Sequence, residues 1–208
     1  MELTMPRCWE RKCWISPISG GLLEKSLCGA GQNGAGAEKV YTGALMTLKG
    51  DGSSFTAHIG YQGFTGQHLD MNYVARHLGR KTESLMESNG VLNGNAFKLF
   101  RGSIDFVKGC AGSVGNEKED VLLLGDDVVN QTIPLILCAE EDVEGNHGAS
   151  IGELDEKTLF YLMSRGFTKE AAEAMIAGAR LEAIAAEIPI PEVREQVEKY
   201  LEEQHEEL

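Results

Sequence analysis

The strongest constraint on the fold is the recurrence, between residues 41 and 125, of short segments in which apolar and polar residues alternate. Phe55, Ala57 and Ile59 lie on one face of such a segment, which is the two-residue period of a β-strand. The sequence therefore predicts short strands at ALMTL (44–48), SFTAHI (54–59), HLDMNYV (68–74), ESLMES (83–88), AFKLF (96–100), SIDFV (103–107) and VLLL (121–124).

Glycine-containing turns separate these segments. Fourteen of the 25 glycines lie between Gly43 and Gly125, and turns are predicted at residues 49–52, 89–90, 93–94 and 108–109. Both a β-sandwich and a parallel β-helix contain many short strands with frequent turns. The turns vary in length and polar residues recur inside the strands, which favours the solenoid, in which each rung packs on its neighbours. At this point both architectures stay open.

The pattern changes after Ile151 and becomes helical. Asp155 is a good N-cap for a helix that ends at Arg165-Gly166, and Thr168 is a good N-cap for a second helix. In that second helix an apolar stripe is expected from Ala172, Met175, Ile176, Ala179 and Ile184. A third helix is expected to begin at Pro191, with an apolar face formed by Val193, Val197, Tyr200 and Leu201.

The charge of the chain is concentrated in its second half. The net charge is -13, made up of +3 over residues 1–116 and -16 over residues 117–208, so nucleic acid is not the expected partner. The chain has no run of 18 apolar residues that would predict a membrane span, and its first residues do not resemble a signal peptide, so we expect a cytoplasmic location. The five cysteines are odd in number and lack a close CxxC pair, so no disulfide framework is expected; Cys8 and Cys13 are interpreted as free thiols rather than metal ligands, and the roles of Cys8, Cys13 and Cys28 stay open.

Residues 119–147 concentrate chemistry that could bind a metal. Several carboxylates accompany Cys138 and His147, a donor set that suits iron or another divalent metal of intermediate softness. His147 lies between Asn146 and Gly148, so its ring is expected on an exposed turn. A solvated acidic surface is the alternative interpretation, and Cys138, which follows the apolar run IPLIL, is expected to be buried as a small hydrophobic residue.

The same region resembles a known family. Pro134, Asp142-Val143, His147-Gly148-Ala149, Gly152, LFYL (159–162) and SRG (164–166) follow, in order and spacing, the carboxyl-terminal signature of the SufB/SufD family, the scaffold proteins of the SUF iron-sulfur cluster assembly machinery. Phe100-Arg101-Gly102 resembles an upstream strand of that family, so the resemblance extends over residues 41–186.

The resemblance implies a mainly β fold, a right-handed single-stranded parallel β-helix followed by a small helical domain. The implied organisation is an unmatched segment at 1–40, a β-helix at 41–152 and a helical domain at 153–208. In that family two core subunits pair through their β-helices, and the terminal helices dock the ABC-type ATPase SufC. The resemblance therefore implies an assembly scaffold that holds an iron-sulfur cluster transiently and is not itself an enzyme.

The resemblance also implies roles for individual residues. His147 matches a histidine of the D-type subunit, and Glu119 stands where the B-type subunit has a cysteine, so a D-type subunit is implied whose partner supplies the thiolate. His147 and Glu119 are the implied metal-site residues. The implied residues for docking the ATPase are Leu159, Phe160, Tyr161, Met163 and Arg165.

The chain is shorter than is common in the family, which implies a short or amino-terminally truncated member. Such a solenoid would expose the edge of its first rung unless residues 13–27 or a partner cover it. Two alternative functions stay open: a β-helix enzyme acting on carbohydrates, for which the adjacent Asp126 and Asp127 are poor partners, and a degenerate paralogue without an iron role. The sequence leaves open whether the partner is a second copy or a different subunit.

Overall fold

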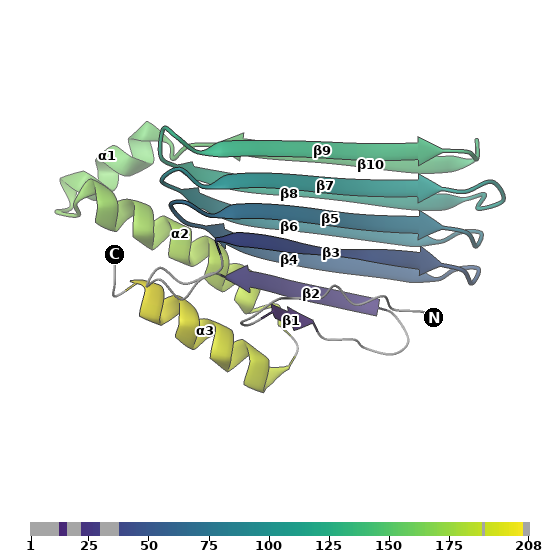
Figure 1. The fold of residues 1–208 in the computed structure, drawn as a ribbon, viewed down its shortest axis with the longest axis horizontal. Coiled ribbons are helices and arrows are strands. Elements are labelled where there is room, and N and C mark those ends of the chain that lie inside the picture. The colour runs from purple at the N-terminus through teal and green to yellow at the C-terminus, as the bar shows by residue number, and fades with distance from the viewer. Residues whose placement is uncertain (1–12, 16–21, 30–37, 189, 206–208) are drawn as a thin grey trace.

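The computed structural model describes residues 13–15, 22–29, 38–188 and 190–205. Their strands form two sheets that face each other (Figure 1). One sheet, called sheet A, has the order β1 (Cys13–Ile15), β2 (Leu22–Gly29), β4 (Ser54–Gly63), β6 (Glu83–Asn93), β8 (Ser113–Leu124) and β10 (Val143–Gly152). The other, called sheet B, has the order β3 (Lys39–Leu48), β5 (His68–His77), β7 (Phe97–Phe106) and β9 (Val129–Cys138).

The chain alternates between the two sheets, so each pair of consecutive strands forms one rung of a solenoid. Each strand from β2 to β8 pairs in parallel with the strand two places further along the chain, as in Ser54 with Glu83 and His68 with Phe97. The result is a parallel β-solenoid of about four turns. This confirms the predicted solenoid and excludes the sandwich, whose strands would pair mainly with antiparallel neighbours.

The lumen between the sheets is the main core. Inward residues alternate with outward ones along each strand, as in β5, where Leu69, Met71 and Tyr73 are buried between partly exposed neighbours. Phe55, Ile59, Phe100, Ile104 and Phe106 from the other strands fill the same space. Each fully buried side chain of this size contributes about 1.5–3 kcal/mol, so the stacked inward residues hold the rungs together.

Two local predictions were wrong. Asn89-Gly90 is not a turn but lies inside β6, where a Cβ on Gly90 would lie 2.0 Å from the ring of Tyr61, so this glycine makes room for an aromatic side chain. Residues 96–100 and 103–107 are not two strands, since residues 97–106 form the single strand β7. The turns predicted at residues 49–52, 93–94 and 108–109 are confirmed, with a positive φ at Gly52, Gly94 and Gly109.

The solenoid ends differently at its two extremities. Part of segment 13–27 extends sheet A at the first end, because β2 pairs in parallel with β4 and β1 pairs antiparallel with β2. At the other end, β9 and β10 are the last strands of their sheets and have one paired neighbour each within the described part of the chain. The last rung therefore presents two strand edges.

Three helices follow the last strand: α1 (Glu156–Ser164), α2 (Lys169–Ala185) and α3 (Pro191–His205). Asp155 and Thr168 cap α1 and α2 as predicted, each by accepting a backbone N–H bond. α2 lies against the outer face of sheet A and α3 packs on α2 (Figure 1). Among the described residues, none of the helices combines the length and the apolar character that a membrane span requires.

The predicted stripe of α2 is confirmed in part, since Ala172 is buried and Ile176 and Ile184 pack against a buried cluster. Met175 is 40% exposed, whereas Ala177, Leu181 and Ala185 pack with Val91 and Leu122 of sheet A. Ala177, Leu181 and Ala185 recur every four residues, so they line one side of the helix, and that side meets the sheet. The expected apolar face of α3 is confirmed, since Val197 and Leu201 are buried in the same cluster and Val193 and Tyr200 pack against it.

Candidate functional site

A cluster of polar side chains lies inside the solenoid, between the apolar core and the last rung. Lys98 of β7 and Glu119 of β8 are almost completely buried and form an ion pair across the lumen. Glu119 also accepts hydrogen bonds from the Tyr61 hydroxyl at 3.1 Å and from Thr132 Oγ1 at 2.6 Å. The ammonium group of Lys98 donates further bonds to Asn130 Oδ1 at 2.9 Å and Thr132 Oγ1 at 3.0 Å.

The surroundings of Lys98 and Glu119 compensate the charges of these two side chains inside the lumen. The Lys98 ammonium lies 5.6 Å from the ring centroid of Tyr61 and 5.3 Å from that of Phe100, both within cation–π range. Burial lowers the pKa of Lys98, while the nearby Glu119 carboxylate raises it. Burial and the same carboxylate raise the pKa of Tyr61 well above its ordinary value, so Tyr61 stays a hydrogen-bond donor.

Glu117 of β8 is a second buried carboxylate in this part of the lumen. It is 5% exposed, and burial together with the neighbouring Glu119 raises its pKa to about 7. Among the described residues, its Oε2 atom has no hydrogen-bond partner. Glu117 thus differs from Glu119, whose two oxygens accept bonds from three side chains.

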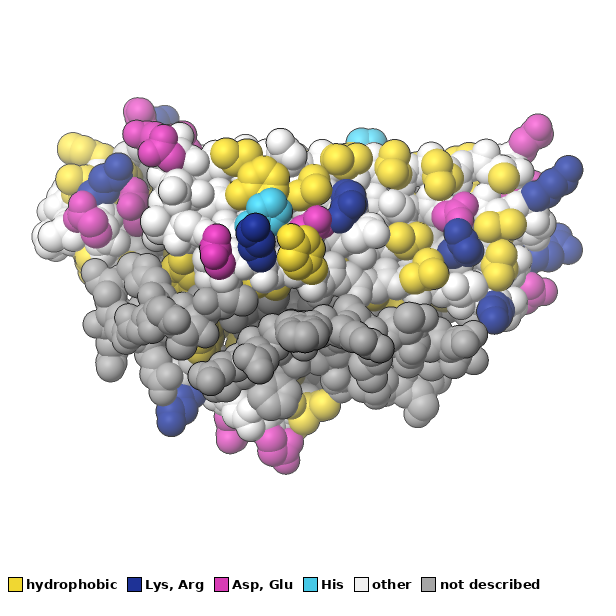
Figure 2. Space-filling model, in the orientation of Figure 1, with side chains coloured by type: hydrophobic (Ala, Val, Ile, Leu, Met, Phe, Trp, Pro, Cys, Tyr) yellow, Lys and Arg dark blue, Asp and Glu magenta, His cyan; other side chains and the backbone are white. Residues whose placement is uncertain are grey.

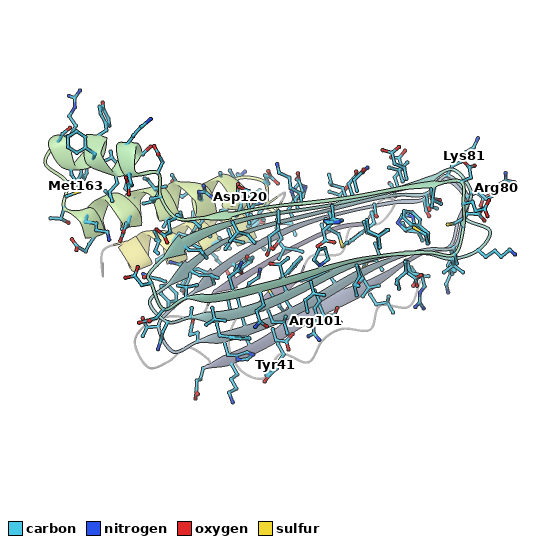
Figure 3. The ribbon with its side chains drawn as sticks, turned by 90° about the horizontal axis from the view of Figure 1, so that it is seen from above. Tyr41, Arg80, Lys81, Arg101, Asp120 and Met163 are labelled. Carbon is cyan, nitrogen blue, oxygen red and sulfur yellow. The ribbon has the colours of Figure 1, made fainter. Side chains whose placement is uncertain are left out.

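His147 lies at the open end of the lumen. The predicted turn was wrong, since His147 belongs to β10, but its predicted exposure is confirmed. A Cβ on Gly145 would contact Ile136 and Phe106, so Gly145 faces the lumen, and His147, two residues further along the strand, faces the same side. Figure 3 looks down on this end and shows the side chains between the two sheets.

The structure places the two predicted metal-site residues on neighbouring strands but not opposite each other. Glu119 pairs in register with Ala149, whereas His147 pairs in register with Glu117. A metal ion at Glu119 would have to compete with its buried partner Lys98. Within the part of the chain that the structure describes, no three His, Cys, Asp or Glu side chains converge on a point that could hold a metal ion.

Cys138, Asp126 and Asp127 lie in surroundings that differ from those expected from the sequence. Cys138 is exposed rather than buried, because it is the last residue of β9 on the last rung. Asp126 and Asp127 lie in the turn after β8 and not on a strand, and both are exposed. Their position on the outside of a turn offers no paired-acid arrangement inside the lumen.

The helix α1 forms an exposed arm beyond the last rung. It has no buried residue, and Phe160, Tyr161 and Met163 are 74%, 55% and 47% exposed. The guanidinium of Arg165 lies 5.1 Å from the centroid of the Tyr161 ring, while Leu159 is half-buried. Figure 3 shows Met163 at the far end of the arm, away from the strands. The residues predicted to dock a partner are therefore largely accessible.

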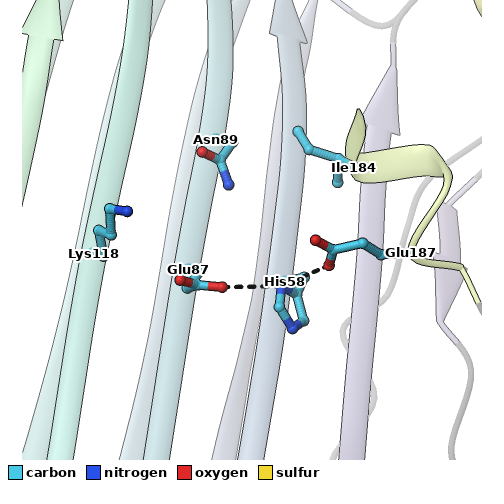
Figure 4. Close-up of a pocket in the computed structure, with 6 residues that line it drawn as sticks. All are labelled: His58, Glu87, Asn89, Lys118, Ile184 and Glu187. Atoms are coloured by element: carbon cyan, nitrogen blue, oxygen red, sulfur yellow. Dashed lines mark ion pairs between the residues drawn. The ribbon is translucent and has the colours of Figure 1, made fainter. Parts of the chain in front are cut away.

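A small pocket lies where the end of α2 meets sheet A. It is lined by His58, Glu87, Asn89, Lys118, Ile184 and Glu187 (Figure 4). His58 Nδ1 is 2.9 Å from Glu187 Oε2 and 3.3 Å from Glu87 Oε2, so the imidazole joins the segment after α2 to the sheet. This contact attaches the segment after α2 to sheet A of the solenoid.

Sequence reasoning missed Lys98 and Glu117 as lumen residues. The strand period contained a signal for both, because Lys98 shares its face with Phe100, and Glu117 shares its face with Val121. A charged residue at an inward position of an alternating strand marks a polar lumen. The partners Tyr61 and Thr132 come from β4 and β9, and only the stacking of the rungs brings them to the pair.

The fold and the site define a class: a parallel β-solenoid with a polar lumen that opens at its last rung, followed by an exposed helical arm. The family model described as the SufBD core domain of the SUF system for iron-sulfur cluster assembly matches residues 23–180. The chain belongs to this family. The match begins at residue 23, within the segment 1–40 that was expected to be unmatched.

Several curated proteins are similar to this chain. It is 36% identical over 125 residues to an iron-sulfur cluster assembly SufBD family protein of Mycobacterium leprae, covering 60% of this chain and 14% of that protein. It is 32% identical over 126 residues to SufD of Bacillus subtilis, covering 61% and 29%, and 31% identical over 144 residues to SufB of the same organism, covering 69% and 31%. The chain thus spans less than a third of each of these relatives, and it is about equally similar to SufD and SufB.

Proposed function

We propose that this chain is a D-type core subunit of a SUF-type complex that assembles iron-sulfur clusters. Membership of the SufBD core family carries the proposal, because the relatives of that family are named for iron-sulfur cluster assembly. In this proposal the chain is a scaffold, the iron-sulfur cluster is its transient cargo, and ATP hydrolysis belongs to a partner.

The open end of the solenoid supports the proposed cargo role. His147 faces the lumen side of the last rung, and the buried Lys98–Glu119 pair lies one rung below. Imidazole and carboxylate groups suit the reception of iron better than the retention of a finished cluster, which thiolates favour. A second core subunit meeting this rung would supply the thiolate.

The edge of the last rung supports pairing between core subunits. β9 carries Ile133, Leu135 and Leu137 on its outer side, and these are 44%, 45% and 52% exposed. Figure 2 shows hydrophobic side chains in a row along the top of the molecule, over β9. An exposed strand edge with apolar side chains is a template for pairing with another strand.

The arm α1 supports docking of an ABC-type ATPase, and a co-purification experiment tests this part of the proposal. We expect Phe160→Ala combined with Met163→Ala to abolish capture of a co-expressed SufC-type ATPase, because aromatic anchors account for much of the affinity of such interfaces. The matched control is Tyr41→Ala, an aromatic that is 60% exposed on sheet B. Wild-type capture by the double variant would contradict the docking proposal.

Pairing through the last rung is tested by the oligomeric state. Leu135→Lys places a charge on the outer side of the β9 edge and is expected to prevent association with a second core subunit in analytical ultracentrifugation. Leu45→Lys on β3, 48% exposed at the opposite edge of sheet B, is the control and should leave association unchanged. Equal association of the two variants would exclude the β9 edge as the interface.

A degenerate paralogue that keeps only the partner surface is the second candidate function. Glu119 favours this second function, because its carboxylate already accepts hydrogen bonds from Lys98, Tyr61 and Thr132. Anaerobic reconstitution with the partner, followed by visible spectroscopy and an iron count, separates the two functions. Iron uptake unaffected by His147→Ala would support the paralogue.

A further inference from the structure

The unusual group in the lumen is Glu117. Its side chain is 5% exposed, and its Oε2 atom is without a hydrogen-bond partner among the described residues. An unpaired carboxylate oxygen that is taken out of water costs free energy unless a donor or a cation compensates it. A native buried oxygen of this kind needs a water molecule or an ion to complete its environment, and the neighbouring residues decide between them.

Glycine on the facing sheet makes room for this carboxylate. A Cβ on Gly102 of β7 would lie 1.9 Å from Glu117 Oε1 and 2.6 Å from Oε2. The Glu117 side chain therefore extends across the lumen from β8 to β7. Pro134 of β9 is the in-register neighbour of Gly102 on the next rung, so the carboxylate lies directly below the last rung.

His147 is the in-register neighbour of Glu117 in sheet A. Adjacent strands are about 4.8 Å apart, and in-register residues of parallel strands project to the same side of the sheet. The histidine and the buried carboxylate consequently occupy consecutive rungs on the lumen side. The histidine is exposed at the open end, and the carboxylate lies beneath it.

We infer that Glu117, rather than Glu119, is the buried carboxylate that receives a divalent transition-metal ion together with His147 at the open end of the lumen. This rests on the proposed function, in which iron is the cargo. Oxygen and imidazole nitrogen donors suit first-row divalent ions. Water or a facing subunit supplies the remaining ligands, since the described residues of one chain provide no convergent third ligand.

The alternative carboxylate is already engaged. Glu119 accepts bonds from Lys98, Tyr61 and Thr132, so a cation there would have to displace a buried ammonium group. Glu117 has a free oxygen and needs no such exchange. We therefore expect substitution of Glu117 to weaken metal binding more than substitution of Glu119 does.

The test titrates the full chain anaerobically with Co²⁺, followed by visible absorption and calorimetry. Glu117→Gln and His147→Gln are each expected to weaken Co²⁺ binding by at least about tenfold and to change the ligand-field bands. Glu144→Gln is the matched control, since Glu144 is an exposed carboxylate on β10 that accepts a bond from Asn146. It should bind Co²⁺ within about twofold of the wild type.

Two further variants keep the inference falsifiable if Glu117→Gln unfolds. Glu117→Asp retains the charge but shortens the side chain, and we expect weaker Co²⁺ binding with altered bands. Glu119→Gln keeps the size of the side chain but leaves Lys98 without its counter-ion, so its folding is checked by circular dichroism, and we expect it to weaken Co²⁺ binding less than Glu117→Asp does. Absence of Co²⁺ binding by the wild type, or binding that follows Glu119 and ignores Glu117, overturns the inference.

The outcomes separate this inference from the proposed function. If Co²⁺ binding ignores Glu117 while the chain still captures its ATPase and takes part in cluster assembly, the inference fails and the function stands. If Co²⁺ binding requires Glu117 and His147 but the chain captures no ATPase and supports no assembly, the function fails and the metal site stands.

Discussion

At the scale of single residues, the lumen depends on one buried ion pair. Lys98 is completely buried and Glu119 is 1% exposed, so each charge is compensated by the other and by neighbouring hydroxyl groups. Such a pair is a weak source of net stability, but losing one partner leaves an uncompensated charge in the core. The pair therefore makes this rung sensitive to single substitutions.

Lys98→Met is expected to lower the free energy of unfolding by about 3–5 kcal/mol, because Glu119 would stay buried without its counter-ion. Denaturation in guanidinium chloride measures the loss. The double variant Lys98→Met with Glu119→Leu should recover part of it, since neither charge then remains. A double variant less stable than Lys98→Met would contradict this reasoning.

His77 predicts a pH dependence of stability. Its ring is buried, contacts Thr82 Oγ1 at 2.7 Å and Ser84 Oγ at 2.9 Å, and burial lowers its pKa from 6.5 to about 4. Between these values the unfolded chain binds more protons than the folded chain, so the contribution of His77 to stability is present above pH 6.5 and is lost as the pH falls towards 4. Thermal unfolding of His77→Gln should show a shallower pH slope across this window, and parallel slopes would exclude the effect.

At the scale of elements, the strands are shaped by where glycine is needed. Gly90 lies inside β6 because the ring of Tyr61 on the neighbouring strand occupies the space that a side chain would fill. Asn-Gly usually marks a tight turn, and that local preference predicted one here. Parallel pairing of β6 with both β4 and β8 outweighed it.

Gly90→Ala is expected to destabilise the protein by about 1–3 kcal/mol, because the new Cβ would lie 2.0 Å from the Tyr61 ring. Gly148→Ala on β10 is the control, since a Cβ there meets no atom within 4 Å. Urea denaturation of both variants checks the difference. Equal stability of the two would show that the ring moves aside without cost.

The elements of the helical part were largely predictable from local signals. Asp155 and Thr168 cap their helices, and Gly166 adopts the positive φ that ends α1. These contacts lie within three residues of each other, so they are readable in the sequence. The face of α2 that meets sheet A was not predictable, because it depends on the distant residues Val91 and Leu122.

At the scale of the whole molecule, α2 and α3 are joined to the solenoid by one apolar cluster and by polar contacts. Leu181 is 1% exposed in that cluster, Arg180 pairs with Asp120 at 2.5 Å, and His58 contacts Glu187. The arm α1, with its exposed residues, follows β10 along the chain and contacts α2. The stability of the contact of α2 and α3 with the solenoid therefore controls how α1 is positioned.

Leu181→Ala should remove about 2–5 kcal/mol from the packing of α2 on sheet A while the lumen core stays intact. Hydrogen exchange is expected to become faster in α2 and α3 and to stay slow in β5 and β7. Met175→Ala, at a position that is 40% exposed on the same helix, is the control. Faster exchange throughout the solenoid would show that the two parts unfold together.

The sequence by itself determined the kind of molecule: alternating strands with glycine turns, a helical end with its caps, and a family signature around His147. These are local patterns, and backbone geometry makes them readable. Only the tertiary structure decided that Lys98 neutralises Glu119, that Glu117 lies under His147, and that α1 is exposed. The reason is physical: stacking of the rungs brings together residues about thirty positions apart, and the register of that stacking sets which carboxylate meets which partner.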